Sequence, residues 1–310
     1  MKIAFVFPGQ GSQSVGMFDA WADNAVATET IASASAALDQ DLAALMAQGP
    51  ADALDLTTNT QPVMLAAAVA MYNAWIDAGG QQPALVAGHS LGEYSALTAA
   101  GALDLEDAVR LVRVRANAMQ DAVPVGTGAM AAILGLEDAA VQQVCEQAGT
   151  DGVVEAVNFN APSQVVIAGH VAAVEKACAL ARDNGARRAV MLPVSAPFHS
   201  SLLEPAAAVL QAALADVRIR TPRIPLINNV DVARPDQPDA IKDALVRQAW
   251  HPVRWVEVIQ AMKNDGVTHV IECGPGKVLG GLTRRIDRDL VSLSITDPAS
   301  MQAALETLEG

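Results

Sequence analysis

Short runs of valine, isoleucine and leucine alternate along this chain with longer alanine-rich stretches. The first run covers residues 3–7, helical stretches follow to about residue 78, a second run covers 84–87, and a long helix is expected from Leu105. Such alternation is typical of helices packed around a largely buried parallel sheet. After residue 200 it predicts a helix to Asp216, strands over 224–229, 269–272 and 290–295, helices over 238–250 and 253–263, and a C-terminal helix. We therefore expect an α/β fold.

A different order interrupts this alternation after a Pro- and Gly-containing stretch at 123–128. The pattern there predicts strands over 130–136, 153–159, 164–168 and 188–193, and helices over 137–148 and 171–184. This β-α-β-β-α-β order is that of a ferredoxin-like unit. We expect a small domain at 125–195, inserted into a larger discontinuous domain of residues 1–124 and 196–310. Inserted domains commonly leave an active-site cleft between the two bodies.

The composition argues against several classes of protein. With 310 residues, 52% of them hydrophobic, the chain can bury a large core. A formal charge of -14 opposes binding to nucleic acid or an anionic membrane, because phosphate binding needs clustered Lys and Arg. The apolar run at 64–71 is too short to span a bilayer, and the chain starts in a strand without a signal-peptide pattern, so we expect a cytoplasmic protein. The three cysteines are widely separated and no metal-ligand motif occurs, so we expect no metal.

The sharpest chemical signal is the stretch Gly88-His89-Ser90-Leu91-Gly92, which ends a strand and runs straight into a helix. G-x-S-x-G in this context predicts a nucleophile elbow, because glycines leave room where strand and helix crowd together and the serine hydroxyl is held at the helix N-terminus. The alternative is an ordinary glycine-rich turn. We take Ser90 as the candidate nucleophile.

A serine hydroxyl needs a base to take its proton, and the chain offers five histidines. His199 lies in the irregular stretch PVSAPFHSSLLEP, at the return from the small domain to the large one, where functional loops tend to lie. His251 is the runner-up, and a hydrogen-bonded loop histidine is the alternative reading of His199. The other three are expected to have structural roles: His89, adjacent to the serine, would support the turn, His269 inside a strand would be a core histidine, and His170 at a helix start would lie at the surface or cap the helix. No acid occurs in a distinguishing context to orient His199, so a main-chain carbonyl could do so.

Arg115 falls on the apolar face of the helix expected from Leu105. A buried guanidinium must be paired, since breaking a buried ion pair costs about 3 to 5 kcal/mol. One reading is a permanent partner in the core. The other is a substrate carboxylate, gripped bidentately when the substrate binds.

Two glycine-rich loops could be read as phosphate cradles. The first, FVFPGQGSQSVG at 5–16, has Ser14 where a dinucleotide fingerprint needs a third glycine. The second, GPGKVL at 274–279, lacks the Walker spacing. Neither loop supports a bound nucleotide cofactor.

The motifs taken together resemble the malonyl-CoA:acyl carrier protein transacylase family of fatty-acid synthesis. They run in order over essentially the full length: FVFPGQGSQ, TQPVML, GHSLGEYSAL, RANAMQ, GTGAMAAILG, NFNAPSQVVIAG, SAPFHSSLLEPAA, WHPVRW and ECGPGKVLGGL. The resemblance implies a hydrolase-like large domain with a mainly parallel sheet and a ferredoxin-like insert.

The resemblance also implies a role for each matching residue. Ser90 would attack the malonyl thioester, His199 would be the base held by a backbone carbonyl, and Arg115 would hold the free malonyl carboxylate. Gln248 matches the segment whose main chain supports the histidine. His251 stands where the family more often has Asn, and we assign it no catalytic part.

Further positions match the family's pocket. Gln61 and Asn160 match polar pocket residues, and Phe198 resembles a bulky residue that crowds out an α-methyl branch. The N–H of Leu91, which follows the nucleophile, and that of Gln10 in the first loop would form the oxyanion hole. The anion that this loop cradles would then be transient.

The reaction implied is ping-pong transfer of malonyl from malonyl-CoA, through a malonyl-serine ester, to the phosphopantetheine thiol of acyl carrier protein. No bound cofactor is implied, since the coenzyme A thioester is the substrate. Alternatives are an acyltransferase that loads a polyketide carrier, a serine thioesterase or hydrolase, and a nucleotide-binding or scaffold protein with a degenerate site.

An acidic carrier protein must dock on this acidic enzyme through a local basic patch. The densest basic cluster comprises Lys277, Arg284, Arg285 and Arg288, and a second comprises Arg187 and Arg188. Each could equally be a solvated end of a helix or strand.

Overall fold

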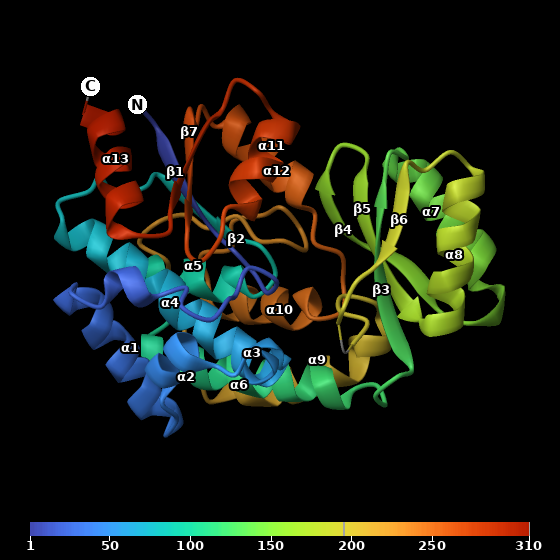
Figure 1. Cartoon of the computed structure of the whole chain (residues 1–310), viewed down its shortest axis with the longest axis horizontal. Coiled ribbons are helices and arrows are strands. Elements are labelled where there is room, and N and C mark those ends of the chain that lie inside the picture. The colour runs from blue at the N-terminus through green and yellow to red at the C-terminus, as the bar shows by residue number, and fades with distance from the viewer. Residues whose placement is uncertain (195, 310) are drawn as a thin grey trace.

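A four-stranded parallel sheet forms the centre of the larger part of the molecule (Figure 1). The structure, a computed structural model, describes residues 1–194 and 196–309. The strands are β1 (Ile3–Phe7), β2 (Leu85–Gly88), β7 (His269–Cys273) and β8 (Val291–Ile295), in the order β2-β1-β7-β8. All residues of β1 are buried, because β1 pairs with β2 on one side and β7 on the other and is covered on both faces.

Helices cover both faces of this sheet, and the alternation of side chains along β1 shows how. Phe5 and Phe7 belong to a core shared with α4 (Thr57–Asp77) and α6 (Leu105–Asp121). Val6 points to the other face, into a core shared with α11 and α12. The helices α11 and α12 cover Trp255–Asn264 and Val278–Ile286. The other helices of this part are α1 (Ala25–Leu38), α2 (Leu42–Gln48), α3 (Ala51–Asp55), α5 (Gly92–Ala99), α9 (Glu204–Ala215), α10 (Pro238–Gln248) and α13 (Pro298–Glu309).

A second, antiparallel sheet lies at the other end of the molecule (Figure 1). Its strands are β3 (Gly128–Leu134), β4 (Val154–Ala161), β5 (Gln164–His170) and β6 (Arg188–Met191), in the order β4-β5-β3-β6. The helices α7 (Asp138–Ala148) and α8 (Val171–Asp183) pack on one face. This confirms the predicted ferredoxin-like order within an α/β fold.

The domain limits themselves stay a prediction. Two of the predicted limits, residues 195 and 310, lie outside the described residues. The second sheet is joined to the larger part of the molecule by pairing, because Asn158 of β4 forms a single parallel bridge with Val253, in the segment just before α11. Phe159 N–H donates to Val253 O at 3.0 Å, and Val253 N–H donates to Val157 O at 2.8 Å.

The strand predicted at 224–229 is wrong in extent. Only Leu226 forms an isolated parallel bridge, to Val86 of β2. Pro225 has no N–H to donate to a ladder, and the N–H of Asn229 donates instead to the Glu93 carboxylate at 2.9 Å. The segment therefore lies beside the sheet without extending it as a strand.

Among the described residues, no helix is both long enough and apolar enough to cross a membrane. The cytoplasmic location stays a prediction.

Candidate active site

Ser90 lies in the tight turn between β2 and α5, with a positive φ of 52°. The two flanking glycines are sterically required. A Cβ on Gly88 would lie 1.8 Å from the Gly92 carbonyl, and a Cβ on Gly92 would lie 2.1 Å from Phe7 O of β1. The G-x-S-x-G stretch thus folds as the strand-turn-helix elbow that its spacing predicts, and it exposes a strained serine at a helix start.

Asn229 holds this turn from the far side. Its Oδ1 accepts from Ser90 N–H at 2.7 Å, and its Nδ2 donates to Gly88 O at 2.7 Å. No motif marks Asn229, which stands at the end of a predicted strand. The N–H of Ser90 is thereby already used, so it is not free to bind a substrate oxygen.

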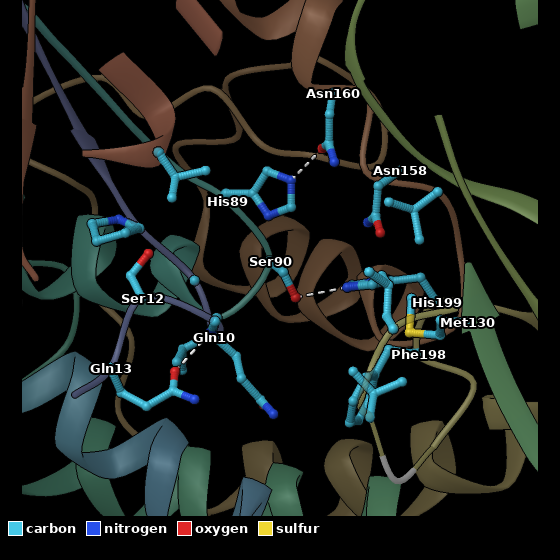
Figure 2. A pocket seen from close by; sticks show the side chains of 18 of the residues that line it. Gln10, Ser12, Gln13, His89, Ser90, Met130, Asn158, Asn160, Phe198 and His199 are labelled. Carbon is cyan, nitrogen blue, oxygen red and sulfur yellow. Dashed lines mark hydrogen bonds between the residues drawn. The ribbon is translucent and has the colours of Figure 1, made fainter. Parts of the chain in front are cut away.

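The structure brings Ser90 and His199 together: the serine Oγ lies 2.6 Å from Nε2 of the imidazole (Figure 2). The other ring nitrogen, Nδ1, lies 2.9 Å from the main-chain oxygen of Gln248. A carbonyl can only accept, so Nδ1 carries the proton and Nε2 is left to accept from the serine hydroxyl. Burial, with the positive charge of Arg115 as the next cause, lowers the pKa of His199 to about 3. The imidazole is therefore a neutral base at physiological pH.

Arg115 reaches the same point from α6 and is 2% exposed. Its Nη2 donates to Ser90 Oγ at 3.0 Å and to Gln248 Oε1 at 3.0 Å, and its Nη1 donates to Gln61 Oε1 at 2.8 Å. The guanidinium also lies 5.5 Å from the centre of the Tyr94 ring. In the described part of the chain no carboxylate forms an ion pair with it, and its Nε has no hydrogen-bond partner. A permanent acidic partner in direct contact with Arg115, one of the two interpretations of the sequence, is therefore absent from the described residues, and the buried Glu93 carboxyl is linked to Arg115 through the Gln248 side chain.

Gln248, the last residue of α10, contacts every component of this cluster. Besides its main-chain contact with His199, its Nε2 donates to Ser90 O at 2.8 Å and to the Glu93 carboxylate at 3.2 Å. Burial raises the pKa of Glu93 to about 7. Glu93 directly follows the elbow in GHSLGE, and its position in the sequence does not predict a part in the site. Its carboxylate fixes the Gln248 amide with the NH2 toward Ser90 and the oxygen toward Arg115.

The loop after β1 lies across the site from His199 (Figure 2). A Cβ on Gly9 would lie 2.7 Å from His89 O, so only glycine permits this approach of the loop to the elbow. The side chain of Gln10 is held by Thr57 at the start of α4, whose hydroxyl donates to Gln10 Oε1 at 2.7 Å. Within the described residues, the N–H groups of Gln10 and Leu91 donate to no other protein group.

A cavity of about 610 Å³ opens over the serine, lined from both sheets. Met130 and Phe198 line it beside His199, as Figure 2 shows. Asn160 also lines it, but its Oδ1 is engaged with Nε2 of His89 at 2.8 Å. Gln61 lies at its base on Arg115. All of the predicted pocket residues thus lie at this one cavity or beneath it.

The other histidines have different contacts. His89 packs on the Trp255 ring at 5.4 Å and bonds Asn160, so it supports the turn from behind. The runner-up, His251, is hydrogen-bonded through Nδ1 to Arg247 O at 2.8 Å, and its ring contacts the Trp250 ring at a tilt of 59°. The structure thus places His199, and not His251, on the serine.

The predicted basic cluster lies on and near α12, and its side chains are exposed. Arg285 is not free, because it donates to Gln164 Oε1 and, at 3.3 Å, to Pro162 O in the β4–β5 turn. It therefore links α12 to the second sheet, and of this cluster Lys277, Arg284 and Arg288 remain as candidates for docking, beside Arg187 and Arg188 of the second cluster.

Comparison with known proteins identifies the family. The family model described as "Acyl transferase domain" matches residues 4–288. The "Malonyl CoA-acyl carrier protein transacylase" of Escherichia coli (strain K12) is 54% identical over 98% of this chain and 99% of its own length. The chain belongs to the malonyl CoA-acyl carrier protein transacylase family. This confirms the resemblance seen in the sequence, and the protein is an acyltransferase.

Solved structures of the transacylase family match the whole fold. An acyl-carrier-protein S-malonyltransferase from Burkholderia pseudomallei 1710b is 65% identical, with a TM-score of 0.98 over 99% of this chain and 100% of its own. A structure titled as a type II PKS acyl-carrier protein in complex with its malonyl-transacylase matches at 46% identity and a TM-score of 0.98, over 99% of this chain and 100% of that one.

Metal ligands are not assembled anywhere in the ranges 1–194 and 196–309: no group of three or more His, Cys, Asp or Glu side chains there could hold an ion. Cys145, Cys178 and Cys273 are buried and free.

Proposed function

We propose that this transacylase transfers the malonyl group from malonyl-CoA to the phosphopantetheine thiol of an acyl carrier protein, through a malonyl ester on Ser90. One observation carries the proposal. The Ser90 hydroxyl lies between a neutral imidazole and a buried guanidinium that has no carboxylate partner among the described residues. The imidazole makes the Ser90 hydroxyl a nucleophile, and the guanidinium selects an acyl group with a free carboxylate.

The resting contacts prepare the attack. Arg115 donates into one lone pair of Ser90 Oγ, so the hydroxyl proton points to Nε2 of His199. As Oγ attacks the thioester carbon, His199 takes this proton, and its Nδ1–H stays on the Gln248 carbonyl. The tetrahedral intermediate collapses when the C–S bond breaks, and His199 returns the proton to the coenzyme A sulfur. The second half-reaction runs in reverse with the carrier thiol, and Ser90 regains its proton.

The negative charge of the tetrahedral oxygen is stabilised by the N–H groups of Leu91 and Gln10. Leu91 lies in the elbow and Gln10 in the loop packed against it, and neither N–H donates to another described protein group. Loss of one such donor typically costs about 3 kcal/mol of transition-state stabilisation.

Arg115 holds the malonyl carboxylate. The carboxylate carbon of a malonyl group lies two bonds from the carbon under attack. A guanidinium within hydrogen-bond distance of the Ser90 hydroxyl can therefore also reach the malonyl carboxylate. When substrate binds, the charge that is unpaired in the resting site gains its partner. Phe198 and Met130 crowd the cavity beside His199, which limits branching of the acyl group.

The carrier protein docks through Lys277, Arg284 and Arg288, next to the residues of α12 that line the cavity mouth. Opposite charge at this rim favours an acidic partner on a protein of net charge -14.

Intact-protein mass spectrometry after mixing with malonyl-CoA tests the function. We expect one malonyl increment on the wild type, much less label from acetyl-CoA, and none on Ser90→Ala. A malonyl increment on Ser90→Ala would eliminate the nucleophile assignment.

Two alternatives remain, and one has support from a neighbour. The match to a structure of a type II PKS acyl-carrier protein with its malonyl-transacylase favours a polyketide carrier as a second candidate acceptor. Comparison of the malonyl transfer rates to a fatty-acid carrier protein and to a polyketide carrier protein distinguishes these two acceptors. A thioesterase would instead release free malonate faster than it loads either carrier thiol.

A further inference from the structure

Four polar side chains form a continuous hydrogen-bond chain from Arg115 to the loop after β1. Arg115 Nη1 donates to Gln61 Oε1 at 2.8 Å, Gln61 Nε2 donates to Thr57 Oγ1 at 3.2 Å, and Thr57 Oγ1 donates to Gln10 Oε1 at 2.7 Å. A threonine hydroxyl has a single proton, which here is given to Gln10, while its lone pair accepts from Gln61. All three bonds therefore run in one direction, an arrangement in which each bond polarises the next.

The chain follows from the first turn of α4. Thr57 and Gln61 are four residues apart, so their side chains lie one above the other on one face of the helix. Both are buried, with 2% and 1% exposure, whereas Gln10 is exposed. Thr57 is thus the last buried member of the chain, and its hydroxyl fixes a side chain that solvent would otherwise leave free.

The loop depends on this contact because glycines flank Gln10. Gly11 has a φ of 109°, and nothing packs within 4 Å of the place where its side chain would be. A second contact holds the loop, from Gly11 N–H to Gln13 Oε1 and on to Asp55, but it is exposed to solvent. Glycine backbones adopt many conformations. Gly9 is packed against His89 O of the elbow, so the conformational freedom lies on the Gly11 side of Gln10, where the side-chain contact with Thr57 restrains the direction of the Gln10 N–H.

We infer that Thr57 is a positioning residue for acyl transfer. It holds Gln10 so that the main-chain N–H points at the substrate carbonyl oxygen, and it ties that position to the Arg115–Gln61 pair at the carboxylate site. The inference rests on the proposed function. Thr57 touches neither the substrate nor the reacting atoms and acts through Gln10, so its removal affects the chemical step more than substrate binding.

The test compares three variants of the full chain with the wild type. Thr57→Val removes the hydroxyl and keeps the shape, and Thr57→Ser keeps the hydroxyl. Thr60→Val is the matched control. Thr60 is equally buried on the same helix, but its hydroxyl donates to Leu54 O at 2.6 Å and takes no part in the hydrogen bonds from Arg115 to Gln10. Rates of malonyl transfer from malonyl-CoA to pantetheine are normalised to the enzyme that mass spectrometry shows to be labelled at Ser90.

We expect Thr57→Val to lower kcat about 10-fold or more with a change of less than about 3-fold in KM for malonyl-CoA. Thr57→Ser and Thr60→Val are expected to stay within about 3-fold of the wild-type kcat. A kcat for Thr57→Val near that of the wild type overturns the inference. So does an equal loss in Thr57→Ser or in Thr60→Val, because the hydroxyl would then not be the cause.

A double-mutant cycle tests whether Thr57 acts through Gln10. Gln10→Met removes the acceptor and keeps the side-chain length, so in that background Thr57→Val should lower kcat by less than about 2-fold. Independent, multiplicative losses would overturn the inference. A wild type that forms no Ser90 adduct would instead contradict the proposed function, so the two failures are distinguishable.

Discussion

The role of Arg115 depends on the groups that surround its buried charge. A guanidinium that is 2% exposed would be costly without compensation, and in the resting site three neutral acceptors and the face of Tyr94 supply it. Neutral acceptors satisfy its hydrogen bonds but do not neutralise its charge. The site therefore gains most from a ligand that brings a negative charge.

The acyl preference should depend on this charge. We expect Arg115→Met to lower kcat/KM for malonyl-CoA relative to acetyl-CoA by about 10- to 100-fold, the range of a charge-assisted hydrogen bond of about 1.5 to 3 kcal/mol. Steady-state transfer from both donors measures the ratio. Arg113→Met, on the same helix but bonded to Gln40, is the matched control. An unchanged ratio would return Arg115 to a purely structural role.

The pH dependence of acylation should depend on His199 and Arg115. Burial and then the charge of Arg115 lower the pKa of His199 from 6.5 to about 3, so the free wild-type enzyme keeps a neutral base well below pH 6. Arg115→Met removes the second cause, so the pKa rises part of the way back and His199 becomes protonated at higher pH. The acid limb of kcat/KM should move up, measured with acetyl-CoA so that no substrate carboxylate intervenes.

One further variant controls this measurement. The comparison in a Glu93→Gln background removes the other buried group at the elbow, whose pKa lies near 7. An acid limb that stays in place, or moves down, would contradict the assignment of His199 as the base.

At the scale of elements, the elbow is fixed by contacts between backbones. Strand β2 and helix α5 meet so closely at Gly88 and Gly92 that neither position has room for a Cβ. The spacing of two glycines around a serine, between an apolar run and a helix, is therefore a local signal of a tertiary constraint.

Gly92→Ala should destabilise the protein by about 3 kcal/mol or more, because its Cβ would lie 2.1 Å from Phe7 O. Thermal or urea unfolding measures this change. Gly281→Ala in α12 is the matched control, since nothing lies within 4 Å of its Cβ position and alanine favours a helix by up to about 1 kcal/mol. Equal stability of the two variants would show that the elbow can relax.

The segment at 224–229 shows where local pattern fails. Its apolar residues predict a strand, but Pro225 cannot donate to a ladder and the Asn229 N–H is taken by Glu93. Competition from a buried carboxylate 136 residues away in sequence is invisible to any local rule. Asn229 also holds the elbow through its side chain, a role that no motif in the sequence predicts.

At the scale of the whole molecule, the cavity exists because the second sheet and the larger part of the molecule are held together. The Asn158–Val253 bridge and the contacts of Arg285 with the β4–β5 turn join them on one side of the site. The candidate catalytic groups, Ser90 and His199, come from the larger part, and Met130 and Asn160 of the second sheet complete the wall of the cavity.

Docking of the carrier should depend on charge at this rim. We expect Arg284→Glu with Arg288→Glu to raise KM for carrier protein about 10-fold and to leave Ser90 labelling by malonyl-CoA unchanged. Arg218→Glu, an exposed arginine just after α9, is the matched charge reversal elsewhere. The salt dependence of transfer should fall in the double variant only. An unchanged KM would place the docking surface elsewhere.

The sequence by itself determined the α/β class, the ferredoxin-like order of the second sheet, the elbow and the family, because each follows from a short-range pattern: a period, a glycine spacing or an ordered set of motifs. It also isolated Arg115 as a charge on an apolar helix face. Only the tertiary structure decided what that charge meets. Its contacts lie 25, 54 and 133 residues away in sequence, and they come from three different segments. The parts of Asn229, Glu93 and Thr57 were likewise undetermined, since a hydrogen bond between distant residues depends on how whole elements pack and leaves no periodic trace in the chain.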